Sequence, residues 1–290
     1  MSKKIVIIDN SNLSYSGDDI DGSIIRGTEA SLILLAEQFV KMNFEVDYCN
    51  CINDIKKING VNYFNKKLIN KNKIYNLAIV ISDANEFNRV SSIKRAVFSN
   101  SNQPIEKFIR KKQLIPFLKF KPTLITLCDY QFKKRSFFTS FYGKKNIPIT
   151  VDPKFLKIEI DEYYLPKKNV VYNIRSNRNL DQLIKIWCEK IFPVNNEFKL
   201  YITPDLIAYN NYHKENNIFL RTITSRSDMI NELKNYRALT YLGHKSDIFT
   251  LTAEEAIKLC LPVVTFGIGS LKERVTHDET GFIAKNEQEF

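Results

Sequence analysis

Two carboxylates near the C-terminus, Asp247 and Glu255, are separated by seven residues and flank a turn that leads into a helical stretch. The first can lie in the loop, and the second on the helix near its positively polarised N-terminal end. Such an end attracts a pyrophosphate, and a carboxylate is a good acceptor for the two hydroxyls of a ribose. Gly267 and Gly269, in a turn after the next strand, would let backbone approach a bound sugar or phosphate. The pattern favours a nucleotide-sugar pocket in residues 247–283.

The elements that must position this site are predicted from the apolar pattern of the second half. Strand-like apolar runs alternate there with segments of helical spacing. The expected strands are 169–172, 199–202, 238–242 and 262–266, and the expected helices are 180–191, 227–235 and 253–260. This alternation predicts an α/β architecture.

The first half begins with a strand–helix–strand unit of the kind that builds doubly wound sheets. Further strands are expected after it, and Pro116 is expected to break a helical segment, because proline lacks the backbone N–H. The predicted elements are strands at 4–9, 44–48, 77–81 and 124–127, a helix that begins at Thr28, and the helical segment 105–120. We therefore predict one Rossmann-like domain over residues 1–155, a charged linker over 156–168 and a second Rossmann-like domain over 169–290.

Residues 247–283 resemble family 4 of the retaining glycosyltransferases. The family signature has two acids eight positions apart, a Pro-Val strand, a Gly-rich turn with a Glu and a Thr-Gly-Phe segment, all present here in order. The resemblance implies the GT-B fold, in which two Rossmann-like domains face one cleft. It also implies that Glu255 holds the nucleotide ribose. Asp247 would contact the donor sugar with Phe249, Thr250 and Leu251, and Asp in place of the family's Glu shortens that reach by one methylene.

The resemblance extends to the start of the second domain, where the family has a basic pair that clamps the pyrophosphate. Arg175 and Arg178 occupy that region. Guanidinium groups suit the role because they bind phosphate oxygens bidentately and stay charged. The segment Arg178-Asn-Leu-Asp resembles the family's Arg/Lys-Gly-Leu-Asp, with Asn179 in the place of glycine.

Two further segments of the chain resemble family motifs. Residues 26–29, which include Gly27, are similar to the Gly-Gly-x-Glu loop that faces donor and acceptor across the cleft. Residues 147–155 are similar to the Asn-Gly-Val-Asp-x-x-Phe junction before the second domain. The resemblance implies that the first domain is the acceptor side. Family members usually continue beyond the Thr-Gly-Phe segment, so the chain is expected to be a shortened member or a C-terminally truncated fragment.

Structural alternatives exist for each of these residues. Glu255 could be an exposed acid on a helix surface, Asp247 could cap the helix that follows it, and the two arginines could be solvated charges. Gly27 could be a simple turn glycine. No catalytic residue is assigned: the histidines are expected to be solvated loop residues, and Asp83 and Asp129 only follow strand-like runs. The histidines are His213, His244 and His277.

The net charge of +11 is concentrated in the first half of the chain. Residues 1–150 hold 24 Lys and Arg and 13 Asp and Glu, whereas residues 151–290 hold 19 of each. The stretch from Lys107 to Lys145 has 11 basic residues, one acid and many aromatic residues. This composition suits an anionic membrane surface or a lipid-diphosphate acceptor, and nucleic acid is the less favoured partner. About half of the aromatic side chains could simply be core.

These observations predict a retaining glycosyltransferase. It would move a sugar from a nucleoside-diphosphate sugar to the hydroxyl of a saccharide or lipid-linked acceptor, in cell-surface polysaccharide or glycolipid synthesis. We expect no metal and no cofactor besides the donor, and a cytoplasmic protein that can associate peripherally with the membrane. The alternatives are a non-catalytic GT-B relative that binds a nucleotide or a partner, and a basic nucleic-acid-binding protein.

Overall fold

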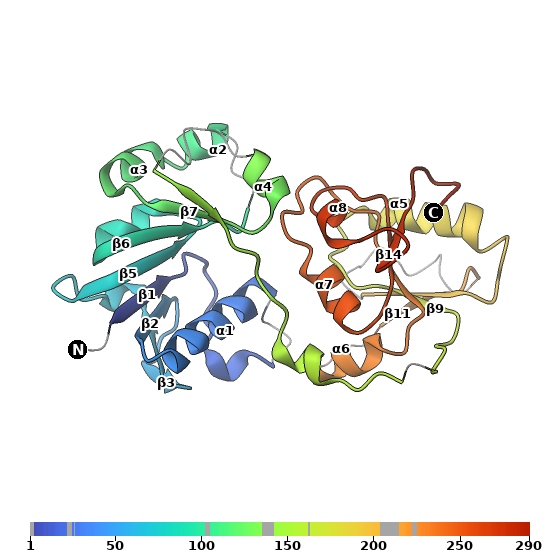
Figure 1. The fold of residues 1–290 in the computed structure, drawn as a ribbon, viewed down its shortest axis with the longest axis horizontal. Helices are drawn as coiled ribbons and strands as arrows, with labels where there is room; N and C mark the ends of the chain where they lie inside the picture. The colour runs from blue at the N-terminus through green and yellow to red at the C-terminus, as the bar shows by residue number, and fades with distance from the viewer. Residues whose placement is uncertain are drawn as a thin grey trace. The chain divides into compact units, whose positions relative to one another are not determined.

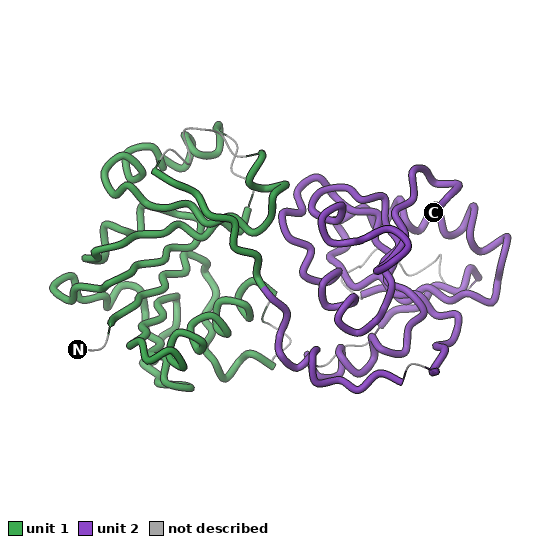
Figure 2. The backbone as a smooth tube through the Cα atoms, in the orientation of Figure 1, with its two compact units in different colours: residues 1–149 green, residues 150–290 purple. Residues whose placement is uncertain are grey.

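The computed structural model of the chain describes residues 3–21, 25, 27–101, 105–134, 142–161, 163–203, 215–221 and 225–290. The chain divides into two compact units, residues 1–149 and 150–290 (Figure 2). Each unit is a largely parallel β-sheet with helices packed against it, so the predicted α/β architecture is confirmed (Figure 1). Residues 150–168, which precede the first strand of the second sheet, belong to unit 2.

Unit 1 has an eight-stranded sheet in the order β3-β4-β2-β1-β5-β6-β7-β8, in which only β3 is antiparallel to its neighbour. The order reverses between β1 and β5, as in doubly wound sheets. The strands are β1 (Lys4–Ile8), β2 (Glu45–Asn50), β3 (Lys56–Ile58), β4 (Val61–Asn65), β5 (Ile74–Ile81), β6 (Ser91–Phe98), β7 (Thr123–Thr126) and β8 (Lys144–Asn146).

Helices cover both faces of the unit 1 sheet. Figure 1 shows α1 (Gly27–Lys41) on one side and α2 (Ile105–Arg110) and α3 (Leu114–Phe120) on the other. The short α4 (Asp129–Lys134) follows β7. Side chains alternate between the faces of a strand, so Val6 and Ile8 of β1 pack in one cluster with Phe108 of α2 and Phe117 of α3.

Unit 2 has a six-stranded, fully parallel sheet in the order β11-β10-β9-β12-β13-β14. Its order reverses between β9 and β12, which makes the carboxyl ends of these two strands the switch point where doubly wound sheets bind ligands. The strands are β9 (Asn169–Tyr172), β10 (Lys199–Ile202), β11 (Ile218–Leu220), β12 (Ala238–Thr240), β13 (Val263–Thr265) and β14 (Gly281–Ile283).

The helices of unit 2 are α5 (Leu180–Ile186), α6 (Arg226–Leu233), α7 (Leu251–Lys258) and α8 (Leu271–Arg274), and a π-helical turn, Trp187–Ile191, extends α5. The core is one continuous cluster that includes strand residues such as Val171 and Leu239 and helix residues such as Leu183 and Ala256. Trp187, the only tryptophan of the chain, is 1% exposed within this cluster.

One predicted element is wrong in detail. Pro116 does not break the helical segment 105–120. The break lies at residues 111–113, where Lys112 adopts a left-handed conformation with φ of 52°, and Pro116 lies in the first turn of α3. The first-turn N–H groups have no intrahelical acceptor, so proline costs nothing there.

Some sequence-based predictions fall on residues that the structure does not describe. Arg26, Arg135 and His213 lie outside the described residues. Within the described part of the chain, no helix has both the length and the apolar character required to cross a membrane.

Candidate functional site

The loops that follow β9, β12 and β13 meet at the switch point of the unit 2 sheet. Gly243, after β12, forms a parallel bridge with Ile268, after β13. Asn179, after β9, donates a hydrogen bond of 2.6 Å from Nδ2 to the carbonyl oxygen of Gly243. The three loops are therefore joined by backbone and side-chain contacts. Most residues predicted to bind the donor lie on them.

Asp247 lies inside this loop cluster. Its carboxylate accepts a short hydrogen bond from the Tyr241 hydroxyl, and Arg178 Nε is 3.5 Å from its Oδ1. Burial raises the pKa of Tyr241 far above its ordinary value, and the adjacent Asp247 charge raises it further. The phenol therefore remains a donor at any physiological pH. The Asp247 side chain is only 13% exposed, so both contacts are largely shielded from water.

Arg178 is the hub of the cluster. Besides Asp247, its Nη1 lies 2.8 Å from Nδ1 of His244, which also accepts the Ser246 backbone N–H at 3.1 Å. Since Nδ1 accepts, the neutral imidazole carries its proton on Nε2. His244 was expected to be a solvated loop residue, and it is instead half-buried beside Arg178. The sequence holds no spacing signal for this contact, which depends on the packing of two loops.

The loop that carries Arg178 is tied to the sheet by a buried tyrosine. The hydroxyl of Tyr172, at the end of β9, donates to the backbone carbonyls of Arg175 at 2.8 Å and Arg178 at 3.0 Å. Asn179 adopts the left-handed region with φ of 62°, which is why asparagine can stand where the related motif has glycine. Arg175 is exposed, and no described residue forms an ion pair with its side chain.

Both glycines of the predicted turn have left-handed backbones, but their surroundings differ. Gly269 has φ of 76°, and a Cβ built on it would lie 2.5 Å from the carbonyl oxygen of His244. Gly267 has φ of 66°, and its Cβ would lie 3.1 Å from a side-chain methyl of Ile283. Gly269 is therefore required for the close approach of two loops. From the sequence, this glycine was expected to make room for a bound sugar or phosphate.

The other predicted sugar contacts surround the N-terminus of α7. Thr250 is the N-cap, but its Oγ1 pairs with Ser270 Oγ at 3.0 Å and makes no hydrogen bond to the helix. Leu251 begins the helix and is half-buried. The centroid of the Phe249 ring lies 4.2 Å from the guanidinium of Arg274, and this cation–π contact fixes the position of the ring.

Glu255 is 5% exposed and belongs to a buried charge triad. Its Oε1 accepts a hydrogen bond of 3.0 Å from Arg226 Nη2, and Arg226 Nε lies 3.2 Å from Asp152 Oδ2. No described residue donates to Oε2 of Glu255. Burial raises the pKa of Glu255, and the nearby Asp152 carboxylate adds to this, whereas Arg226 opposes it.

The role of Arg226 cannot be seen in the sequence, because this first residue of α6 belongs to no motif. A partial signal existed in the junction motif at 147–155. Asp152 and Phe155 are the Asp and Phe of that motif; Asp152 pairs with Arg226, and the Arg226 guanidinium lies 5.7 Å from the Phe155 ring. The junction segment therefore stabilises the arginine that holds Glu255.

Unit 1 has a second polar cluster, at the carboxyl ends of its own strands. Asp9, after β1, accepts from the hydroxyl of Tyr15 at 2.6 Å, and this hydroxyl also lies 2.6 Å from that of Tyr48. Asn10 donates to Asp83, after β5, at 3.0 Å. These residues lie at the switch point between β1 and β5. Gly27 is the first residue of α1.

Metal binding has no candidate among the described residues, where no group of three or more His, Cys, Asp or Glu side chains is arranged to hold an ion. Asp129 contacts Asn146 by a hydrogen bond of 2.7 Å. His277 accepts the backbone N–H of Ile283 at 3.0 Å, which places it in a local turn next to β14.

Neither the protein-family models nor the curated proteins contain a match to this sequence. Solved structures do match. Sucrose-phosphate synthase of Thermosynechococcus elongatus aligns over 97% of this chain and 85% of its own, with 11% identity and a TM-score of 0.69. A glycosyltransferase of Rickettsia africae aligns over 99% and 86%, with 11% identity and a TM-score of 0.69.

HepE of Anabaena, solved in complex with UDP, aligns over 99% of this chain and 87% of its own, with 15% identity and a TM-score of 0.66. The chain has the GT-B fold. The matches span both units, so each parallel sheet of this GT-B chain has a counterpart in these proteins. The identities are low, and the likeness is one of fold.

Proposed function

We propose that this GT-B chain is a retaining glycosyltransferase that binds a nucleoside-diphosphate sugar at the switch point of unit 2. One observation carries the proposal: the loops after β9, β12 and β13 converge there and bring Arg178 into contact with Asp247. These two residues are far apart in sequence and have complementary expected roles, one toward the diphosphate and one toward the sugar. Ligands bind doubly wound sheets at such a place.

The diphosphate would be bound by Arg178, by the exposed Arg175 and by the N-terminus of α7. Arginine can bind phosphate oxygens bidentately, and backbone N–H groups at a helix start add positive potential. Arg178 is paired with Asp247. A diphosphate would compete for the guanidinium and release the Asp247 carboxylate to accept from the hydroxyls of the donor sugar.

The transfer itself would break the bond between the anomeric carbon and the diphosphate oxygen and form a bond from the same face to the acceptor oxygen. The proton of the acceptor hydroxyl would pass to the departing diphosphate. Arg178 and the α7 terminus would stabilise the negative charge that develops on this leaving group. The proposal assigns this role to protein cations, so it requires no metal ion.

The nucleotide ribose would be bound by Glu255. Arg226 anchors Oε1, which fixes the orientation of the carboxylate and leaves Oε2 without a described partner. An oriented, ionised carboxylate is a strong hydrogen-bond acceptor for a ribose hydroxyl. Uridine diphosphate is the first nucleotide to test, because the similarly folded HepE was solved with UDP and with UDP-glucose.

The acceptor would be a saccharide or a lipid-linked compound presented at an anionic membrane, in cell-surface polysaccharide or glycolipid synthesis. Helices α2 and α3 support this part of the proposal, because they expose apolar side chains between basic ones. The exposed apolar residues are Ile105, Ile109, Leu114, Ile115 and Leu118, and the basic ones are Lys107, Arg110, Lys111, Lys112 and Lys119. Such a mixture binds membrane surfaces by apolar insertion and charge attraction.

Membrane binding is tested by co-sedimentation with vesicles of phosphatidylcholine, with and without about one third phosphatidylserine. We expect binding to the anionic vesicles only, a fall in binding as salt is raised, and a loss of binding in Ile115→Asp. Ile55→Asp is the control, because Ile55 is equally exposed at 73% and lies outside both helices. Equal binding by the two variants would contradict the proposed surface.

A non-catalytic GT-B protein is the second candidate. It is favoured by one observation, the engagement of Arg178 and Glu255 in ion pairs within unit 2. Hydrolysis of UDP-glucose, GDP-mannose and related donors distinguishes the two. A catalyst releases nucleoside diphosphate, and Arg178→Met should abolish this release. Arg237→Met, which changes an arginine whose guanidinium donates to the Pro166 carbonyl, should not abolish it. No release by the wild-type chain with any donor would support the second candidate.

A further inference from the structure

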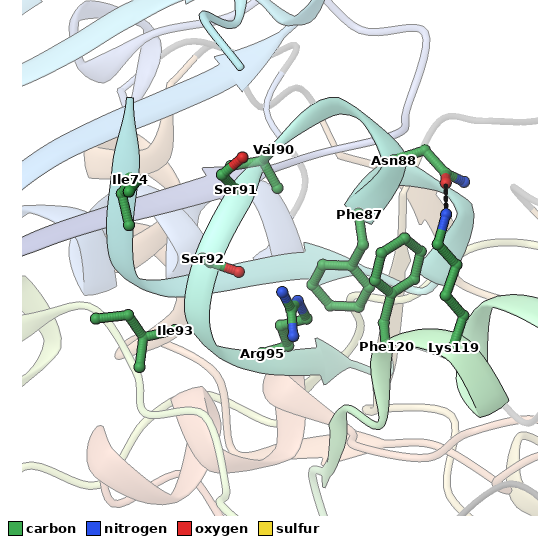
Figure 3. Close-up of a pocket in the computed structure, with 10 residues that line it drawn as sticks. All are labelled: Ile74, Phe87, Asn88, Val90, Ser91, Ser92, Ile93, Arg95, Lys119 and Phe120. Atoms are coloured by element: carbon green, nitrogen blue, oxygen red, sulfur yellow. Dashed lines mark hydrogen bonds between the residues drawn. The ribbon is translucent and has the colours of Figure 1, made fainter. Parts of the chain in front are cut away.

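A pocket of about 470 Å³ lies in unit 1, at the amino ends of β5 and β6. Figure 3 shows the side chains that line it. They come from the start of β5, the start of β6, the 3-10 turn Ala84–Arg89 with the residues after it, and the end of α3. The volume is within the range of small-molecule sites. The polar cluster of Asp9, after β1, and Asp83, after β5, is at the opposite, carboxyl edge of the same sheet, so the pocket is a separate feature.

Arg95 provides the positive charge of this pocket. Its Nε is fully covered, and no described residue accepts a hydrogen bond from this atom or forms an ion pair with the guanidinium. The guanidinium lies 5.6 Å from the centroid of the Phe120 ring, in a cation–π contact. A guanidinium that is partly withdrawn from water without a carboxylate is unfavourable by itself, and this cost is offset when an anion binds.

Two more polar groups border the same space. Ser92 lines the pocket and is 8% exposed, and its Oγ has no hydrogen-bond partner in the described part of the chain. Lys119 lies at the edge, with its Nζ 3.2 Å from Asn88 Oδ1 and 4.8 Å from the Phe120 ring. The lining therefore includes two cations, and none of its residues is acidic.

Apolar side chains form two further parts of the lining, beside the polar Asn88 and Ser91. Phe87 and Phe120 meet at 5.6 Å between ring centroids with their planes 52° apart, and they form an aromatic wall next to Arg95 (Figure 3). Ile74 and Ile93 border the other side and are 65% and 67% exposed. Exposed isoleucines beside a pocket can cover the apolar part of a ligand. The combination of guanidinium, aromatic wall and isoleucines matches a small anion with an apolar or aromatic body.

We propose that this pocket binds a small organic phosphate or carboxylate, with the anionic group on Arg95 and Lys119 and the apolar body against Phe87, Phe120, Ile74 and Ile93. Both anions satisfy a guanidinium bidentately, so the shared chemistry is an amphipathic anion. The site is independent of the donor site proposed in unit 2. It does not require the chain to be a glycosyltransferase.

Phenyl phosphate, benzoate, inorganic phosphate and phenol are suitable probes, followed by ligand-observed NMR and calorimetry on the full chain. We expect saturable binding of phenyl phosphate or benzoate, and at least about tenfold weaker binding of inorganic phosphate and phenol. The affinities of phenyl phosphate and benzoate then show which anion the pocket prefers. Absence of saturable binding by both aromatic anions would overturn the proposal.

The variant Arg95→Met keeps the side-chain length and removes the charge. We expect it to lose at least about tenfold in affinity for the bound aromatic anion, while Lys94→Met, which removes the same charge from an exposed neighbour, retains wild-type affinity. Arg178→Met should also retain it, since that residue belongs to unit 2. Equal affinity in Arg95→Met and Lys94→Met would refute the site.

A structural role for Arg95 predicts a different outcome in thermal unfolding. If the arginine serves ligand binding, Arg95→Met unfolds at a temperature equal to or above that of the wild type, because an unpaired buried donor has been removed. Circular dichroism measures the unfolding temperature of each variant. An unfolding temperature of Arg95→Met several degrees below that of Lys94→Met would show that Arg95 stabilises the fold and would overturn the proposal.

Discussion

Among the described residues, a hydrogen-bond donor contacts only one of the two carboxylate oxygens of Glu255. Arg226 contacts Oε1, and the side chain is almost completely buried. An anchored carboxylate loses little conformational freedom when a ligand binds, which favours a tight contact with one ribose hydroxyl. The chemistry proposed for the nucleotide therefore depends on the protonation state of this one residue.

The raised pKa of Glu255 predicts a pH dependence of nucleotide affinity. Burial raises this pKa, so the carboxylate gains its proton at a higher pH than an ordinary glutamate, whose pKa is about 4.3. Below the raised pKa the neutral acid is a weaker acceptor for ribose. The affinity ratio between wild type and Glu255→Gln should therefore shrink toward one as the pH falls from neutral to below this raised pKa.

Calorimetric titration of both proteins with UDP across that range measures this ratio. Protonation of the diphosphate affects both proteins alike and cancels in the comparison. A ratio that stays constant, or that grows as the pH falls, would be inconsistent with a ribose contact through an ionised Glu255.

At the scale of elements, the site is made by loops whose positions follow from the parallel sheet of unit 2. The sequence predicts β9, β10, β12, β13, α6 and α7 to within a few residues, because their apolar runs and helical spacing are regular. Strands β3, β8, β11 and β14 were not predicted, because their apolar runs are shorter than those at 238–242 and 262–266, which contain β12 and β13. Their positions are determined by pairing with neighbouring strands, as β14 pairs with β13.

The site residues show a similar division. Asp247, Glu255 and Arg178 can be proposed as site residues from the sequence, because motif order and residue type indicate a donor site. Tyr241, His244 and Arg226 could not be, because they contact these residues only after the loops and helices pack. A buried ion pair between distant segments has no characteristic residue spacing, so a single sequence does not reveal it.

The contact between the loops after β12 and β13 predicts unequal effects of two similar substitutions. Gly269→Ala and Gly267→Ala share the cost of a left-handed alanine, about 1–2 kcal/mol. Gly269→Ala also places a methyl group 2.5 Å from a backbone carbonyl, whereas Gly267→Ala meets a side-chain methyl that can move. We expect Gly269→Ala to be the more destabilising by about 1–3 kcal/mol.

Trp187 fluorescence during urea unfolding is a suitable probe, because this single, buried tryptophan lies in the core of unit 2 and reports that unit selectively. If Gly267→Ala were equally or more destabilising, the close loop contact at Gly269 would be refuted.

The triad of Glu255, Arg226 and Asp152 predicts a large loss on removing its cation. Arg226→Met leaves two buried carboxylates without their partner and should destabilise unit 2 by about 3–5 kcal/mol. Arg226→Lys keeps the charge but loses the planar fork that reaches both acids, so its loss should be smaller. The control Arg274→Met breaks the ion pair with Glu254 and the contact with the Phe249 ring.

The same Trp187 unfolding measurement tests whether Arg226→Met loses more stability than Arg226→Lys. A loss in Arg226→Met no larger than in Arg274→Met would show that the triad contributes little to unit 2.

At the scale of the whole molecule, the two units differ in charge and in the kind of ligand their surfaces suit. All of the net positive charge derives from residues 1–150, which hold the exposed apolar and basic face of α2 and α3 and the pocket around Arg95. Unit 2 has balanced charge and holds the residues expected to bind a nucleotide sugar. The GT-B fold supports this division, since it combines two Rossmann-like domains in one chain.

The central claim is that unit 2 binds a nucleoside diphosphate through Glu255, and calorimetric titration of the full chain with UDP and GDP tests it most directly. The account predicts saturable binding of one nucleotide by the wild type and a loss of about tenfold or more in Glu255→Gln. The control Glu232→Gln removes a different arginine-paired carboxylate of unit 2 and should bind as the wild type does. Absence of binding by the wild type, or equal affinity in Glu255→Gln, would contradict the account.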